Sequence, residues 1–203
     1  NNSISNLDLS KNTALKELDC SSNKLLYLDL QNNESLFDID FSDNDDLIGV
    51  KSAGMDIDGV KWMIYNCGTT STASYDKFII TTESGYLYSE ASVACPSGWR
   101  LPTDKELEAL SVNYSAWTSY KGIIGRWFSG SCPYSTTVNR VFFHVKHEFS
   151  TTPLTTGYYW SSTQTNGYGY YTYHKTLEFN SSSVSIEKQD NNDRASVRCV
   201  KDE

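Results

Sequence analysis

The sequence lacks the features that mark two common classes of protein. Lys and Arg are scattered singly, the net charge is −8 and the pI is about 4.9, so no basic stripe is available to bind nucleic acid. No apolar run approaches the roughly 18 residues that a membrane-spanning helix needs. With 38% hydrophobic and 13% aromatic residues, the composition instead predicts a globular chain with a sizeable core.

Sequence motifs for catalysis and for metal or cofactor binding are also absent. There is no G-x-S-x-G elbow, no P-loop, no G-x-G-x-x-G and no C-x-x-C. His144, His147 and Glu148 stand together in "FFHVKHEF", but strand spacing places the two imidazoles on opposite sides. The acidic run over 38–46 lacks the glycine and glutamate of an EF-hand loop. We therefore expect no enzyme activity, no metal and no cofactor.

A 21-residue repeat occupies the first part of the chain, in "LDLSKNTALKELDCSSNKLLYLDLQNNESLFDIDFSDNDDL". This pattern resembles the bacterial leucine-rich repeats of internalin-like surface adhesins, and the resemblance implies a short β-solenoid over residues 1–50. Apolar residues two positions apart share one face of a strand. We therefore expect a buried ladder made of Leu18, Cys20, Ile39 and Phe41. Asn23 and Asn44 are expected to bond the backbone where it bends.

A single helix is predicted early in the second part of the chain, within "ACPSGWRLPTDKELEAL" (94–110). Pro102 disfavours helix at the residue before it, and Thr103 and Glu106 fit the T-x-x-E capping box. Leu107 and Leu110 then fall on one helical face. The rest of this part alternates like β-strands, with a hairpin turn expected over 180–183.

Three motifs in this second part occur in a fixed order: "CPSGWRLPT", "YWSST" and "VRCV". Together they resemble the Fibrobacter succinogenes major paralogous domain, which is common in secreted proteins of Bacteroidetes. The resemblance covers roughly residues 55–203. It implies an α+β fold of the C-type-lectin-like class, related to formylglycine-generating enzymes. The expected architecture is thus a C-type-lectin-like α+β domain behind a short leucine-rich-repeat β-solenoid.

The resemblance also implies a structural disulfide between Cys95 and Cys199. For Cys67 and Cys132 two possibilities stay open, a second disulfide or a buried free thiol at Cys67. Formylglycine-generating relatives need a paired cysteine site near their C-terminal end, where this chain has only Cys199. A degenerate enzyme of that type is therefore kept as a third functional hypothesis, behind the two given at the end of this subsection.

A tyrosine-rich stretch, "TGYYWSSTQTNGYGYYTYHKTLEF", is the best candidate for ligand binding. Aromatic faces stack on sugars and serve as contact hot spots in protein interfaces. Two interpretations stay open, an exposed aromatic platform or tyrosines that decorate a β-surface, and the motif position of Trp160 favours a core role for that residue. The candidate ligand-binding residues are Tyr168, Tyr170, Tyr171, Tyr173 and Trp160.

The first functional hypothesis is a non-catalytic binding or adhesion module that recognises a host or environmental protein or glycan. The alternative is a structural spacer of a surface lipoprotein without a ligand of its own. Because the chain opens inside a repeat, we expect a fragment of a longer protein. The expected location is extracellular or on the bacterial surface, as in an outer-membrane lipoprotein, with any membrane anchor outside this fragment. The sequence leaves the oligomeric state open.

Overall fold

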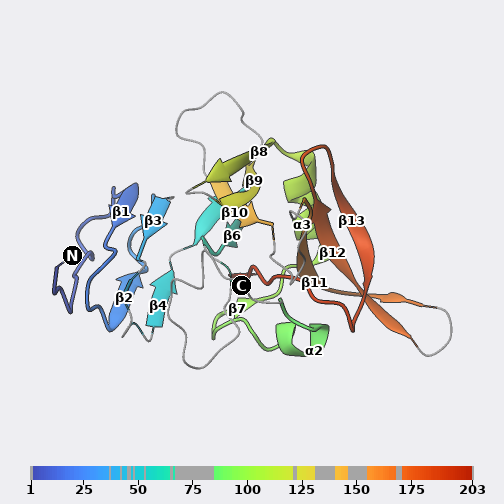
Figure 1. The fold of residues 1–203 in the computed structure, drawn as a ribbon, viewed down its shortest axis with the longest axis horizontal. Coiled ribbons are helices and arrows are strands. Elements are labelled where there is room, and N and C mark those ends of the chain that lie inside the picture. The colour runs from blue at the N-terminus through green and yellow to red at the C-terminus, as the bar shows by residue number, and fades with distance from the viewer. Residues whose placement is uncertain are drawn as a thin grey trace.

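The computed structural model is built mainly from β-strands arranged in several small sheets (Figure 1). It describes residues 2–36, 38–41, 43–44, 47, 49–52, 54–64, 66, 85–120, 123–130, 140–145, 155–167 and 171–202. Within these ranges the helices are one short turn and one nine-residue helix. Neither is long and apolar enough to cross a membrane.

The N-terminal segment contributes four strands, which are β1 (Glu17–Asp19), β2 (Tyr27–Leu30), β3 (Asp38–Asp40) and β4 (Gly49–Ser52). The elements that follow are β5 (Met55–Ile57), β6 (Val60–Trp62), α2 (Tyr88–Ala91), β7 (Trp99–Arg100), α3 (Asp104–Val112), β8 (Ser115–Tyr120), β9 (Ile123–Ser129), β10 (Arg140–His144), β11 (Gly157–Asn166), β12 (Thr172–Phe179), β13 (Val184–Asp190) and β14 (Val200–Lys201).

The predicted α+β fold with a leucine-rich-repeat β-solenoid is wrong. The N-terminal strands form two separate two-stranded parallel sheets, β1–β3 and β2–β4, each only three or four residues long. Residues one repeat apart do lie opposite one another, with Leu18 beside Ile39. The preceding Leu-x-Leu pattern at 7–9 forms no strand, so no third repeat extends these pairs into a solenoid.

The apolar ladder of the N-terminal segment nevertheless forms a small core of its own. Cys20, Ile39 and Phe41 are buried there and Leu18 is partly buried. Asn44 donates to the carbonyls of Cys20 and Phe41 and accepts from the Leu25 amide, which ties the bend at Asn44 to the preceding repeat. Asn23 makes the corresponding bonds: its side-chain nitrogen donates to the carbonyl of Cys20, and its side-chain oxygen accepts from the amide of Ile4.

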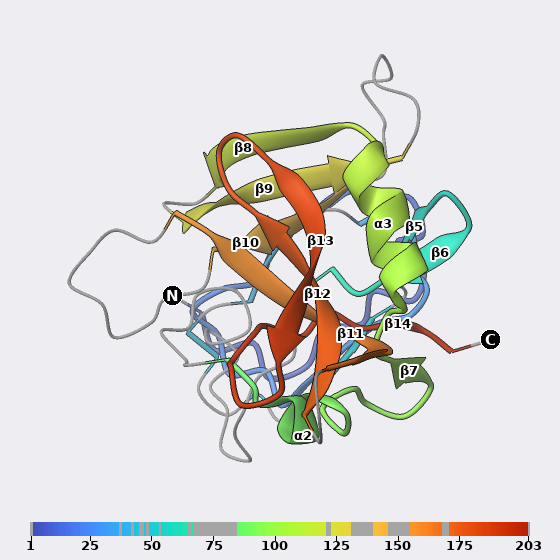
Figure 2. The same ribbon diagram turned by 90° about the vertical axis from the view of Figure 1, so that its right-hand side faces the viewer.

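The main body packs two antiparallel three-stranded sheets around one aromatic core. Their strand orders are β10–β9–β8 and β11–β12–β13, and α3 lies against the second sheet (Figure 2). Phe128 and Phe143 from the first sheet meet Phe179 from the second with ring centroids 5.7 and 6.5 Å apart. Leu107 and Leu110 of α3 are buried in the same cluster, which explains their spacing in the sequence.

A third sheet, in the order β5–β6–β14–β7, brings the end of the chain back to the "GWRLP" segment. Val200 pairs with both Trp62 and Arg100. This sheet links three apolar clusters, because Ile64, just after β6, packs against all of them. An ion pair of 2.8 Å between Lys61 and Glu34 also ties β6 to the N-terminal segment.

Candidate functional site

The start of α3 is held by a charged capping box. Thr103 accepts from the Glu106 amide, while the Glu106 carboxylate accepts from the backbone amide and the hydroxyl of Thr103. Arg100 adds a two-pronged ion pair to the same carboxylate at 2.8 and 2.9 Å. Burial acts to raise the pKa of Glu106, but the bonds from Arg100 and Thr103 outweigh it and the pKa is lowered.

Glu106→Ala should destabilise the protein by about 2 kcal/mol, since it removes both half of the capping box and the partner of Arg100. Because the pKa of Glu106 is lowered on folding, this contribution is present above the ordinary glutamate pKa and is lost as the pH falls through the lower folded value. Urea unfolding at neutral pH and in acid measures both effects. Glu108→Ala, at an exposed position of the same helix, is the control and should change little. Equal losses in the two variants would contradict the assignment.

The first two sequence motifs meet where α3 docks on a bulge in β11. The pairing of β11 with β12 shifts register between Trp160 and Gln164. Within this bulge, Thr163 bonds both the amide and the carboxylate of Asp104, and the Ser162 amide donates to the carbonyl of Pro102 at 2.7 Å. Lys175 of β12 reaches the other oxygen of Asp104 at 2.6 Å, and its hydrogen bond is the main cause of the lowered pKa of Asp104.

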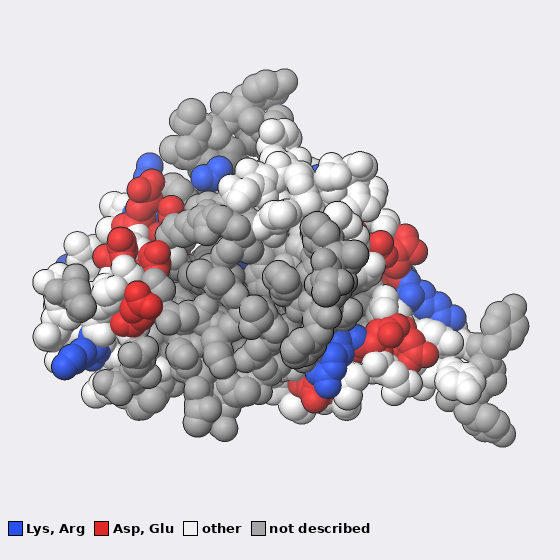
Figure 3. Space-filling model, viewed as in Figure 1, with Lys and Arg blue, Asp and Glu red and all other residues white. Residues whose placement is uncertain are grey.

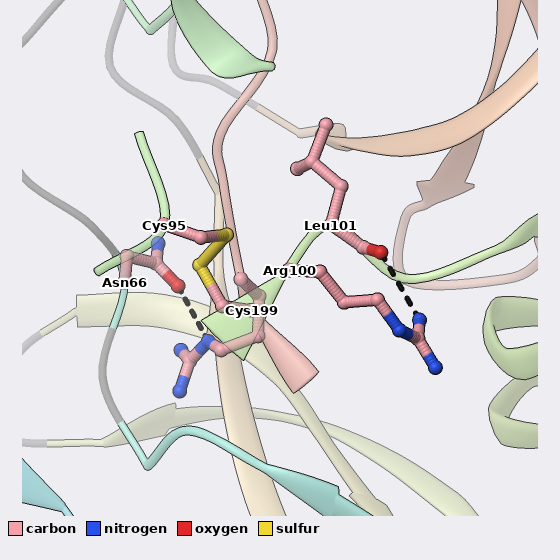
Figure 4. Close-up of a disulfide and its surroundings, with 6 residues drawn as sticks. Asn66, Cys95, Arg100, Leu101 and Cys199 are labelled. Carbon is pink, nitrogen blue, oxygen red and sulfur yellow. Dashed lines mark hydrogen bonds between the residues drawn. A yellow bond between two sulfur atoms is a disulfide. The ribbon is translucent and has the colours of Figure 1, made fainter. Parts of the chain in front are cut away.

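The third motif joins the other two beneath α2, where a disulfide links Cys95 to Cys199 with a Cα–Cα distance of 5.9 Å (Figure 4). The pairing that the family resemblance implied is therefore present. Trp160 lies in the same apolar cluster, and its indole donates to the carbonyl of Tyr86 at 2.7 Å. Trp160 is fully buried, so its candidacy as a ligand-binding residue is wrong and its role is in the core.

A buried polar hub adjoins the disulfide and was missed by sequence reasoning. Arg198, which is 2% exposed, donates to the Asn66 side chain at 2.7 Å and to the carbonyls of Met63 and Phe142. Its guanidinium also lies 4.9 Å from the centre of the Phe143 ring. One side chain thus connects the segment after β6, the middle of β10 and the residues just before β14.

Asn66 extends this hub to an imidazole and a phenol. Its amide nitrogen lies 2.7 Å from Nε2 of His144 and donates to the Tyr159 hydroxyl at 2.8 Å. The Tyr159 hydroxyl in turn donates to the carbonyl of His144. Burial, followed by the charge of Arg198, lowers the pKa of His144 to about 4. We use the name polar hub for Asn66, His144, Tyr159 and Arg198 together.

The sequence does carry one signal for the hub. In "ASVRCV", Arg198 stands between apolar residues in a predicted strand, and a charge at such a position needs partners. Its partners come from distant parts of the chain, however, so the sequence could not name them. The remaining described histidine, His174, is a separate case, because it stacks on Tyr88 with ring centroids 3.3 Å apart and bonds Asn191.

The distal ends of β11 and β12 form a hairpin arm that projects from the body beyond β13 (Figure 1). Tyr173, one of the candidate ligand-binding residues, packs within this arm and stabilises it. The Lys188 ammonium lies 4.0 Å from the centre of its ring and also donates to the carbonyl of Asn166. The Tyr173 ring packs against Gly167, where any Cβ would collide with it. The contacts of Tyr173 are therefore largely made within the protein.

Tyr171, by contrast, is 68% exposed at the start of the returning strand of the arm. Among the described tyrosines of the arm, Tyr171 has the most exposed side chain, and a ligand can contact it. Several other residues named from the sequence lie outside the described ranges, namely Tyr168, Tyr170, Cys67, Cys132, His147 and Glu148.

The N-terminal segment presents an acidic face, seen in Figure 3 as the red side chains over β1 and β3. Glu17 stands opposite Asp38, and Asp19 opposite Asp40. Like charges directly opposite one another oppose strand pairing, so the buried ladder behind them must hold these strands together. Over the described ranges, no group of three or more His, Cys, Asp or Glu side chains is arranged to hold a metal ion.

Comparison with known families identifies the second part of the chain. Residues 57–201 match the family described as the Lcl C-terminal domain. This match spans all three motifs, the polar hub and the arm. No curated protein matches the chain, and no solved structure matches it either. The comparisons therefore give no support to internalin-like leucine-rich repeats or to a formylglycine-generating-enzyme fold.

Proposed function

The chain belongs to the Lcl C-terminal domain family, and on that premise we propose that it is a non-catalytic binding module whose arm contacts a host or environmental protein or glycan. Domains of this family are surface-associated and are not known as enzymes. The observation that carries the proposal is the exposed ring of Tyr171 on the projecting arm.

The construction of the arm supports a binding role. Ordering a loop on binding costs free energy, so a contact residue held in place beforehand binds more tightly. Lys188 holds the arm in place by its contacts with the ring of Tyr173 and the carbonyl of Asn166, and Tyr173 is only two residues from Tyr171. An exposed tyrosine offers a large, rigid and amphipathic surface, which suits both sugar rings and protein surfaces.

The location proposed is the bacterial cell surface or the extracellular space. Structural disulfides persist in oxidising compartments, and the Cys95–Cys199 bond agrees with such a location. An outer-membrane lipoprotein, anchored through a region outside this sequence, fits the same proposal. Reduction of the bond in freshly isolated native protein would argue against it.

Tyr171→Ala should weaken binding of a partner found on a glycan or host-protein array by about tenfold or more, because an exposed aromatic contact is lost. The measurement is the dissociation constant of that partner for the purified chain. Tyr114→Ala removes a tyrosine that is 56% exposed and lies just after the C-terminal end of α3, away from the arm in sequence. This variant should leave binding unchanged.

Each outcome decides between the hypotheses. Equal loss in both variants would place the contact elsewhere than on the arm. A blank array from protein whose circular dichroism and disulfide are intact would contradict the binding module and favour a structural spacer. A partner that is chemically converted by the chain would revive the enzyme hypothesis.

A further inference from the structure

The hydrogen bonds of the polar hub have only one consistent arrangement. A guanidinium can donate but cannot accept, so the oxygen of the Asn66 amide must face Arg198. The nitrogen of that amide then faces His144 and Tyr159. Rotating the amide would set its nitrogen against the guanidinium, donor against donor. Arg198 therefore fixes the orientation of Asn66.

This orientation determines the state of His144. Because Asn66 donates to Nε2 of His144, that nitrogen must accept and cannot carry a proton. The imidazole is thus neutral, with its hydrogen on Nδ1, which lies 3.4 Å from the carbonyl of Val145. A second proton on this ring would break the bond to Asn66 and place a cation in the same hub as Arg198.

No described charge near His144 favours its protonation. The cation Arg198 faces it from the residues just before β14, and the phenol of Tyr159, whose pKa burial raises, faces it from β11. On β9 its partner in register is Gly125, which has no side chain. The neighbouring strand β5 buries Met55 and Ile57 and leaves its one carboxylate, Asp56, exposed.

We propose that the polar hub is an acid-sensitive latch, in which protonation of His144 releases Asn66 and loosens the junction of β6, β10 and β11. The Cys95–Cys199 bond keeps the closing strand attached while the latch is open, because Cys199 is the residue next to Arg198. The latch therefore opens locally and closes again when the pH rises. It gives the protein two conformational states that differ with the acidity of its surroundings.

The test follows the imidazole nitrogens of the full-length, oxidised chain by NMR during an acid titration. We expect His144 to remain neutral, with hydrogen on Nδ1, at about pH 5.5, where a free histidine is largely protonated. Below about pH 5 its protonation should coincide with a reversible change in near-ultraviolet circular dichroism and in the Asn66 side-chain signals. The pKa values of the Asp104 and Glu106 carboxyl groups are also lowered, and the imidazole nitrogen signals, which follow His144 itself, separate its protonation from theirs.

His144→Gln supplies a side chain that can accept from Asn66 without titrating, and it should move the acid transition down by about one pH unit or more. His174→Gln, at a buried histidine outside the polar hub, should leave the transition in place. A transition at the wild-type pH in His144→Gln would overturn the proposal. If that variant does not fold, the wild-type spectrum decides alone, since a His144 ring that is charged at about pH 5.5 with the hub intact would also overturn it.

Discussion

Replacing Cys95 and Cys199 together by alanine should lower the free energy of unfolding by about 4 to 5 kcal/mol. The bond joins residues 104 positions apart, so it removes a large part of the chain entropy of the unfolded state. Domains of ordinary stability have about 5 to 15 kcal/mol in total, so the variant should be close to unfolding at body temperature. Urea unfolding measured at several temperatures gives the difference.

Cys20→Ala is the matched control, because it removes a buried sulfur that forms no cross-link. It should cost only about 1 kcal/mol, as expected for a small apolar side chain in a core. The wild type under a strong reductant should approach the double variant. A double variant as stable as Cys20→Ala would show that packing alone holds the closing strand.

Arg198→Ala should have the second largest effect, a loss of about 3 to 5 kcal/mol. The variant removes the buried donor that Arg198 supplies to the side-chain oxygen of Asn66 and to the carbonyls of Met63 and Phe142. Arg198→Lys should recover only a small part, since one ammonium cannot reach groups placed around a planar guanidinium. Thermal unfolding and urea unfolding both report the loss.

Arg140→Ala provides the comparison, because Arg140 is an exposed arginine that also lies over an aromatic ring, 4.4 Å from the centre of Trp127. We expect a loss below about 1 kcal/mol there. Similar losses at the two positions would mean that the hub contributes no more than a surface contact. Full recovery by Arg198→Lys would contradict the argument from guanidinium geometry.

The parts of the structure that the sequence predicted are those with local or motif-level causes. The capping box of Thr103 and Glu106 depends on residues three positions apart, and the structure contains it. The hairpin turn at 180–183 is likewise present, with the Asn180 amide bonded to the carbonyl of Ser183. The Cys95–Cys199 bond came from a family resemblance, since nothing local marks those two residues as partners.

The fold class and the polar hub depend on contacts between distant residues, which periodicity does not encode. The repeat predicted a solenoid, but pairs of very short strands satisfy the same spacing. Arg198 bonds Asn66 across 132 positions of the sequence, and Asn66 itself stands in no recognisable motif. Among the tyrosines, composition could not separate the packed Tyr173 from the exposed Tyr171, because their difference is set by Lys188 on another strand.

The place of Ile64 has a consequence for any attempt to study the two parts of this chain separately. Cutting the chain between residues 50 and 55, where the repeat ends, would separate Ile64 from the apolar cluster of the N-terminal segment. It would also break the ion pair between Lys61 and Glu34. Each half would then expose apolar side chains that are covered in the intact chain, and such surfaces promote aggregation. Poor solubility of an isolated half would therefore reflect the cut itself and would say nothing against the function of the intact chain.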